Sequence, residues 1–258
     1  SSSVYQFTLT ETGNYIIRYP IGQAILYLPF FIIGHLCALL FDYPTDGFSL
    51  PYDIAMRIGG LAYHSLSFYL IGRILLNFFK LNVVVLTVLV LFLGTYIFCS
   101  LNYPLIAHGS LLFLISILLL FCQQYYKQFK TKYLIAIASV FGLICLCRHT
   151  DVIVIIPVIF WPLVMGKNLK EVWTEILKTR KRDLVIAPLI VFLFAMIQFS
   201  YWKTVGGSFF IDSYKTPSEG LDFLSPHTIP FLFSFKTGWF IYTPLMAIVM
   251  FYLFMRAF

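Results

Sequence analysis

The chain has 258 residues, of which 60% are hydrophobic and only 11% are charged. A soluble domain carries about 25% charged residues, so this composition and the mean hydropathy of +0.88 exclude an ordinary soluble domain and predict an integral membrane protein. The net charge of +7 does not indicate nucleic-acid binding, because the basic residues lie in short loops between apolar segments, as a membrane topology requires.

Eight apolar segments follow one another along the chain. The first covers residues 22–41 and contains Pro29. Each of the next seven predicts a membrane-spanning helix, which needs about 17–25 residues. These seven cover residues 54–78, 82–101, 104–122, 133–148, 151–166, 184–202 and 238–258. The predicted fold class is therefore all-α, a polytopic transmembrane helical bundle that forms a single transmembrane domain over residues 1–258.

Two of the predicted spans, 133–148 and 151–166, are short. They are separated by the polar sequence 148–151, and lysines flank their far ends. This pattern predicts a helical hairpin whose turn lies shallow in the membrane. The basic stretch 167–183 that follows is predicted to be a short amphipathic helix on the anionic inner leaflet.

The charged loops form two sets that alternate along the predicted spans. One set has twelve basic and three acidic residues, a net charge of +9, and the other has six basic and eight acidic residues, a net charge of −2. The positive-inside rule places the +9 set in the cytoplasm. Segment 22–41 breaks the alternation, because its flanks both belong to the outer set. We expect it to be a helix that lies in the outer interface, or re-enters from it, in an outer loop over 1–53. The alternative is an ordinary span with the amino terminus inside. A second outer loop covers 203–237.

Ionisable groups beside a span need a partner or a function. Asp53 precedes Arg57 by four residues, so a helix would pair them; alternatively, Arg57 reaches toward lipid headgroups. Arg148 either closes a tight turn with Asp151 or offers its guanidinium to a lipid phosphate, whose oxygens it matches with paired hydrogen bonds. His108 either packs at the outer end of its helix or hydrogen-bonds a phosphate or a sugar hydroxyl.

Short motifs run through the chain in a definite order. They are Arg18-Tyr19-Pro20-Ile21-Gly22, Leu28-Pro29-Phe30-Phe31, Ala55-Met56-Arg57-Ile58, Ala107-His108-Gly109-Ser110, Leu146-Cys147-Arg148-His149-Thr150, Gln198-Phe199-Ser200-Tyr201-Trp202-Lys203, Gly238-Trp239 and Tyr242-Thr243-Pro244. As an ordered set, which covers nearly the whole chain, they resemble the C-type (GT-C) membrane glycosyltransferases. That superfamily includes the protein O-mannosyltransferases, the aminoarabinose transferases and many uncharacterised bacterial members. The resemblance also accounts for segment 22–41, because these proteins carry interfacial helices in their first outer loop.

The resemblance implies transfer of a sugar from a polyprenyl-phosphate donor to an acceptor at the outer face, here the periplasmic face of a bacterial inner membrane. A carboxylate would act as general base on the acceptor hydroxyl, and cationic groups would stabilise the departing lipid phosphate. The candidates for the phosphate contacts are Arg57, Arg148, Lys203 and Lys236. The candidates for substrate or acceptor contacts are His108, Asp46, Asp53, Asp212 and Tyr214, and the three aspartates are also candidates for a divalent metal ion.

In these enzymes the catalytic acid lies early in the first outer loop, and this sequence begins beyond that point, so we assign the role to no residue here. Two other functions stay open. A transporter or flippase for a lipid or small solute would have paired repeats and polar residues at mid-membrane, whereas the polar residues here lie mainly at the outer rim. The third reading is a non-catalytic membrane subunit of a larger complex.

Overall fold

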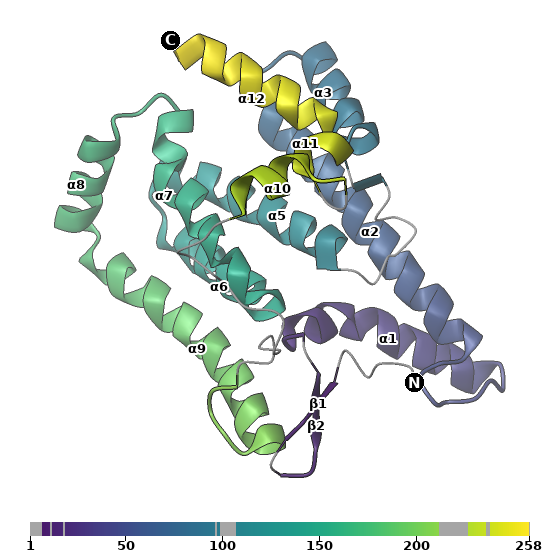
Figure 1. Cartoon of the computed structure of the whole chain (residues 1–258). Coiled ribbons are helices and arrows are strands. Elements are labelled where there is room, and N and C mark those ends of the chain that lie inside the picture. The colour runs from purple at the N-terminus through teal and green to yellow at the C-terminus, as the bar shows by residue number, and fades with distance from the viewer. Residues whose placement is uncertain are drawn as a thin grey trace.

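A computed structural model of the chain describes residues 7–10, 12–17, 19–95, 97–98, 107–211, 227–235 and 238–257. Within this part the fold is all-α apart from one short hairpin, as predicted, and it contains eleven α-helices and one 3-10 helix, η1. Figure 1 shows their arrangement. The helices are α1 (Gly22–Leu40), α2 (Leu50–Leu75), α3 (Leu81–Leu93), α5 (Ala107–Gln128), α6 (Thr131–Cys147), η1 (His149–Val154), α7 (Ile155–Val164), α8 (Leu169–Thr179), α9 (Lys181–Gly206), α10 (Thr228–Phe233), α11 (Trp239–Tyr242) and α12 (Pro244–Ala257).

Three helices, α1, α5 and α9, are long and apolar enough to cross a membrane. The consecutive segments His149–Val164 and Leu169–Thr179 are together long and apolar enough to cross a membrane, but a bend of 109° separates them. Counted as one broken span, they would be the fourth. Helices also form in the other predicted spans. However, α3 and α6 have only 13 and 17 residues, which makes them about 20 and 26 Å long at 1.5 Å per residue. The total of seven spans therefore stays a prediction.

Several helices end elsewhere than the sequence predicted. Helix α5 continues to Gln128, and α9 extends into the predicted loop 203–237 as far as Gly206, where Gly207 with a φ of 78° ends it. A positive φ at this position suits glycine, which has no Cβ. The last predicted span is divided into α11 and α12 at Thr243, because Pro244 has no backbone N–H and is suited to start a new helix.

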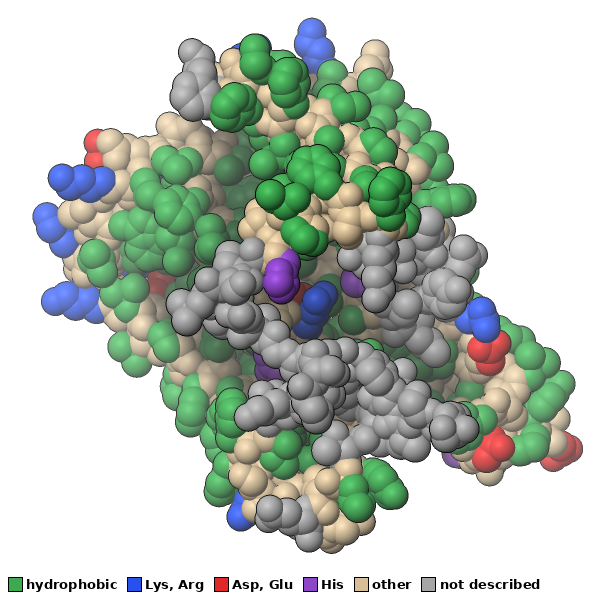
Figure 2. Space-filling view, viewed as in Figure 1, with side chains coloured by type: hydrophobic (Ala, Val, Ile, Leu, Met, Phe, Trp, Pro, Cys, Tyr) green, Lys and Arg blue, Asp and Glu red, His purple; other side chains and the backbone are tan. Residues whose placement is uncertain are grey.

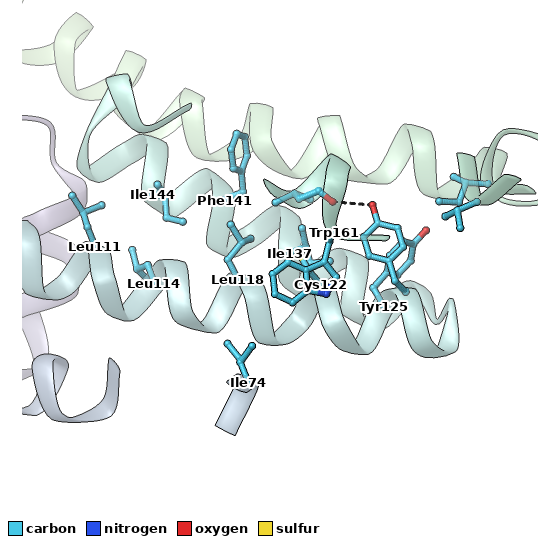
Figure 3. Packing of buried hydrophobic residues seen from close by; sticks show 14 of the residues in the cluster. Ile74, Leu111, Leu114, Leu118, Cys122, Tyr125, Ile137, Phe141, Ile144 and Trp161 are labelled. Carbon is cyan, nitrogen blue, oxygen red and sulfur yellow. Dashed lines mark hydrogen bonds between the residues drawn. The ribbon is translucent and has the colours of Figure 1, made fainter. Parts of the chain in front are cut away.

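The main bundle is formed by α2, α5, α6 and α9, which pack against one another in that order. Its core lies between α5 and α6. Figure 3 shows how the buried side chains of these two helices interlock, with α2 adding one residue from the opposite side of α5. The residues at the centre of this core are Ile74, Leu111, Leu114, Leu118, Cys122, Ile137, Phe141 and Ile144.

The chain turns back between α6 and α7, as the prediction for 133–148 and 151–166 requires, but α7 packs along α5 rather than along α6. Helix α6 ends at Cys147, and η1 makes the turn. Helix α7 then runs back along α5, where the Tyr126 hydroxyl donates a 3.0 Å hydrogen bond to the carbonyl of Val158. The depth of the turn in a membrane stays a prediction.

We name the two ends of the bundle after groups that they carry. At the Arg148 end, the start of α5 and the ends of α6 and α9 come together with the start of α1. The backbone N–H of Ile21 donates a 3.0 Å hydrogen bond to Oε1 of Gln198 in α9. The rings of His149 and Trp202 lie 5.6 Å apart between their centroids.

The α8 end holds the ends of α2 and α5, the starts of α6 and α9, and α8. Here Thr131 donates a 2.9 Å hydrogen bond to Asp183, and Lys167 donates one of 2.6 Å to the carbonyl of Tyr126. Figure 2 shows Lys and Arg side chains gathered over α8. Eleven of the twelve basic residues predicted to face the cytoplasm belong to elements at this end. They are Arg73, Lys80, Lys127, Lys130, Lys132, Lys167, Lys170, Lys178, Arg180, Lys181 and Arg182.

Helix α8 is amphipathic, as predicted. It begins at Asn168, whose side chain accepts hydrogen bonds from the backbone N–H groups of Lys170 and Glu171 and thereby caps the helix. Its buried side chains are Val172 and Ile176. The helix therefore covers one end of the bundle with its apolar face and leaves its charged residues exposed.

Helix α1 lies outside the main bundle, beside the first half of α2 (Figure 1). Its first residue, Gly22, packs on the backbone at the end of α6, and Gly34 packs on the first turn of α2. Halfway along α2, His64 meets Gly109 in the first turn of α5. All of α1 and the first half of α2 therefore lie at or beyond the Arg148 end of the bundle.

A β-hairpin that the sequence analysis did not predict precedes α1. Strands β1 (Phe7–Leu9) and β2 (Tyr15–Ile17) pair in antiparallel register. The hairpin docks on the end of α9, where Thr12 Oγ1 and Asn14 Nδ2 donate hydrogen bonds of 2.7 and 3.2 Å to the carbonyl of Val205. The carbonyl of Val205 lies in the last turn of α9, where backbone carbonyls have no hydrogen-bond partner within the helix.

Candidate lipid-phosphate site

A cavity of about 620 Å³ lies between α6 and α9 at the Arg148 end. Its volume is within the range of about 300–1,000 Å³ that is usual for small-molecule sites. Most of its lining is apolar, and its polar side chains come from the end of α6 and the turn after it and, as Gln198, from α9. The lining residues are Gly142, Cys145, Leu146, Arg148, His149, Thr150, Val191, Phe194, Ala195, Gln198, Phe199, Trp202, Phe210 and Ile211.

Arg148 is placed at this cavity by the way α6 ends. Its backbone is extended, with φ −155° and ψ 113°, and separates α6 from the 3-10 turn of η1. The turn brings Asp151 Oδ1 to 3.7 Å from Arg148 Nε. A guanidinium has five N–H donors, and this ion pair uses only one side of the group. Because the Arg148 side chain is 48% exposed, it can contact a ligand while Asp151 holds its position.

An aromatic wall closes the cavity beside the arginine. Trp202 is 4% exposed, and its ring lies 5.6 Å from each of the rings of His149 and Phe210. Phe210 reaches this position because Gly207 turns the chain back at the end of α9. The wall limits the cavity, so that an apolar ligand would extend away from it between α6 and α9.

His108 belongs to the same end of the bundle, in the first turn of α5, but does not line the cavity. It interacts electrostatically with Arg148, Asp151 and His64. The structure therefore brings together two of the residues that the sequence singled out, His108 and Arg148, at this end of the bundle.

Arg57 and Asp53 do not belong to the lining of this cavity. Arg57 Nε donates a 2.8 Å hydrogen bond to Asp53 Oδ2, with side chains 57% and 48% exposed. This confirms the pair expected from their spacing. Both residues lie in the first half of α2, beside α1, and neither lines the cavity. Arg57 is thus not brought to Arg148 as part of one phosphate site.

Two further candidates have structural partners. Lys203 Nζ donates a 2.9 Å hydrogen bond to the carbonyl of Gly207 and lies over the ring of Phe209, so it caps its own helix. Asp46 accepts hydrogen bonds of 2.8 and 3.1 Å from the backbone N–H groups of Phe48 and Ser49, which shapes the turn before α2.

The remaining candidates, Asp212, Tyr214 and Lys236, lie outside the described residues. Within the described ranges, no three His, Cys, Asp or Glu side chains are grouped so that they could hold a metal ion. The candidate site therefore rests on Arg148, its aromatic neighbours and the cavity.

The sequence analysis missed the cavity itself. Phe194 and Cys145 have no feature that distinguishes them from other residues of an apolar span. Gly142 is the only signal, because an added Cβ there would come within 2.8 Å of Phe194, which marks the close approach of α6 and α9. That approach cannot be inferred without knowing that these two helices are neighbours.

Comparison with known protein families, curated proteins and solved structures finds no match to this chain. The fold and the site define its class in physical terms. In the part of the chain that the structure describes, the fold is all-α apart from one short hairpin, and three helices, or four with the bent pair, are long and apolar enough to span a membrane. An arginine-rimmed apolar cavity lies at one end of its bundle.

Proposed function

We propose that the chain is a membrane glycosyltransferase that binds a polyprenyl-phosphate-linked sugar at the Arg148 end of its bundle and transfers the sugar there. One observation carries this proposal: Arg148 stands at the rim of an apolar cavity between two helices. A polyprenyl phosphate is complementary to this site, because it carries one anionic group at the end of a long apolar chain. The ordered motifs that resemble the C-type glycosyltransferases supply the reaction type.

In this reaction the bond between the sugar and the lipid phosphate breaks, and the acceptor oxygen forms the new bond to the sugar. The proton of the acceptor hydroxyl passes to a carboxylate base, a role that we assign to no residue of this sequence. The negative charge left on the lipid phosphate is stabilised by a fixed cation. Arg148 is the candidate, because its guanidinium forms paired hydrogen bonds with phosphate oxygens.

The charge distribution supports an orientation for the proposed enzyme. Eleven basic residues group at the α8 end, which the positive-inside rule assigns to the cytoplasm. The Arg148 end would then face outward, toward the periplasm of a bacterial inner membrane. Helix α1 lies at or beyond that end, which favours the interfacial placement.

The test is binding of a photoreactive polyprenyl-phosphate sugar to the purified full-length protein, followed by a sugar-transfer assay. Arg148→Gln should weaken binding at least tenfold, since a hydrogen bond to a charged group is worth about 1.5–3 kcal/mol. Arg148→Lys should lie between wild type and Arg148→Gln, because lysine keeps the charge but loses the paired geometry.

Lys203→Gln and Arg57→Gln are the controls, because neither residue lines the cavity. Both variants should bind the lipid as the wild type does. Unchanged labelling of Arg148→Gln would refute the phosphate site. Labelling that depends on Arg148 without any sugar transfer would refute the enzyme and favour a lipid flippase or a binding subunit.

A further inference from the structure

A second apolar cavity, of about 650 Å³, lies between α7 and α9, over the first two thirds of α6. Helix α6 forms its floor. The α9 residues that line it recur every three or four positions, so one continuous face of that helix borders the cavity. The principal lining residues are Leu134, Ile137, Ala138 and Phe141 of α6, Ile155, Val158 and Ile159 of α7, and Leu184, Ala187, Pro188, Val191, Phe192, Ala195 and Phe199 of α9.

The shape of this cavity suits an extended hydrocarbon chain. Its α9 face runs from Leu184 to Phe199, about 22 Å at 1.5 Å per residue. This distance covers most of the hydrocarbon thickness of a bilayer, about 30 Å. In the most apolar part of α9 only 6% of the residues are buried. The groove along this helix is therefore open toward the surrounding membrane, and a lipid could enter it from there.

The α8 end of the groove is closed by α8, which joins α7 to α9 at the edge of the molecule (Figure 1). Helix α8 is bent by 109° from the chain before it. The indole N–H of Trp173 donates a 3.2 Å hydrogen bond to the carbonyl of Ile159, and both residues line the groove. Tryptophan favours the depth of lipid headgroups, so this end of the groove would lie near a membrane surface.

Four basic residues surround this end of the groove within a stretch of five positions. They are Lys178, Arg180, Lys181 and Arg182. Arg180 interacts electrostatically with Tyr125, which lines the groove, so the cluster adjoins the apolar space. The one acidic group among the lining residues, Asp183, is 3% exposed and accepts hydrogen bonds from Thr131 and Tyr125, and the cluster keeps a positive net charge.

We infer that this groove binds one anionic diacyl phospholipid from the leaflet at the α8 end, with an acyl chain between α7 and α9 and the phosphate at Arg180, Lys181 and Arg182. Charge complementarity selects the occupant, because an apolar groove next to four cations favours an anionic headgroup over a zwitterionic one. The headgroup position lies at the opposite end of the bundle from Arg148 and shares no polar residue with the Arg148 cavity, although Val191, Ala195 and Phe199 line both apolar spaces. The inference does not depend on the proposed function.

The test uses the purified full chain in detergent with three probes. These are phosphatidylglycerol, phosphatidylcholine with the same acyl chains, and inorganic phosphate at an equal concentration. Retained lipid is counted by native mass spectrometry, and thermal unfolding is followed in parallel. Phosphatidylglycerol should be retained at one copy and should raise the unfolding midpoint. Equal retention of phosphatidylcholine would overturn the headgroup assignment, and an equal shift with inorganic phosphate would reduce the site to an anion site.

Two variants distinguish the contribution of the headgroup contacts from that of the acyl-chain contacts. The double variant Arg180→Gln/Arg182→Gln should bind phosphatidylglycerol at least tenfold more weakly, whereas Lys80→Gln, which removes a cation at the same end away from the groove, should not. Ala187→Trp should abolish retention without changing any charge, because Ala187 lines only this groove. If Ala187→Trp fails to fold, the double variant decides alone, since it alters only side chains that reach solvent. Wild-type retention in that double variant would refute the site.

Failure of this site and failure of the proposed function are distinguishable. Arg148→Gln should keep the phosphatidylglycerol and lose the polyprenyl-phosphate sugar. The double variant should do the reverse. Loss of both ligands in either variant would show that the two cavities are not independent and would contradict the assignment of one lipid to each end.

Discussion

Thr131 in the first turn of α6 donates a 2.9 Å hydrogen bond to Asp183 in the first turn of α9. Tyr125 of α5 donates a longer one of 3.3 Å to the other carboxylate oxygen. Asp183 is 3% exposed, so this carboxylate joins three helices where the apolar contacts between them end. It fixes the register in which α6 and α9 run side by side. That register also places Gly142 against Phe194, eleven positions further along each helix.

The first prediction concerns this junction. Asp183→Ala should lower the free energy of unfolding by about 1–3 kcal/mol, because it leaves the buried hydroxyl of Tyr125 and the half-buried hydroxyl of Thr131 without their acceptor. Asp183→Asn keeps an acceptor oxygen and should lose less. The measurement is thermal unfolding in detergent with a thiol-reactive dye, since Cys122 and Cys147 are 0% and 4% exposed and react only on unfolding. Equal loss in the two variants would show that charge, rather than hydrogen bonding, holds the junction.

The second prediction compares two glycines inside helices. Gly109→Ala should destabilise the protein, because an added Cβ would lie 2.1 Å from Cε1 of the His64 ring. That ring is 3% exposed and is held by a 2.8 Å contact between Nδ1 and the carbonyl of Gly60, so it has no room to move. Gly72→Ala should stabilise by about 0.5–1 kcal/mol, the usual gain of alanine over glycine in a helix, since its Cβ would meet only Val84 at 3.9 Å.

The same unfolding assay measures both glycine variants. A stable Gly109→Ala protein would mean that α2 and α5 are further apart than the structure shows. Adding His64→Ala to Gly109→Ala tests the cause. This second change should recover part of the loss if the clash with the ring is responsible, and it should add to the loss otherwise.

Local features of this protein could be predicted from sequence because their causes are local. The pairing of Asp53 with Arg57 follows from helical spacing, and the turn at η1 follows from four polar residues between two apolar runs. Helix α8 follows from the alternation of its charges with Val172 and Ile176. In each case the residues that determine the structure are within a few positions of one another.

The hairpin and the two cavities could not be predicted in this way. The sequence 10–14, with Gly13 at a φ of 79°, has the composition of a turn, but strands of three residues produce too short an alternation to recognise. The cavities depend on which helices are neighbours. Helix α9 borders both of them, with Val191, Ala195 and Phe199 shared, and nothing in the apolar sequence of its central part indicates that two cavities adjoin it.

The third prediction distinguishes the effect of backbone strain on stability from the effect of the cavity's geometry on ligand binding. Gly207→Ala and Gly166→Ala each place a Cβ at a positive φ, 78° and 70°, which costs about 1–2 kcal/mol. Only Gly207 directs the chain that carries Phe210 into the Arg148 cavity, and Gly166 has open space around it. Both variants should lose stability, Gly207→Ala the more because its Cβ would also come within 2.9 Å of Thr12 Cγ2, but only Gly207→Ala should weaken labelling by the polyprenyl-phosphate probe. Weaker labelling of Gly166→Ala as well would trace the effect to general destabilisation.

The last prediction concerns the placement of α1. Its length and composition allow it to span a membrane, yet both of its ends lie at or beyond the Arg148 end of the bundle. If it lies in the outer interface, the turn after it faces the same side as the Arg148 end; if it crosses, that turn faces the cytoplasm. Phe48 in this turn is 90% exposed. In intact cells, a membrane-impermeant maleimide should label Phe48→Cys above the background of the native thiols. It should label Lys178→Cys, on the exposed surface of α8, only after the membrane is permeabilised. Protection of both positions until permeabilisation would establish α1 as a span and would contradict the interfacial placement.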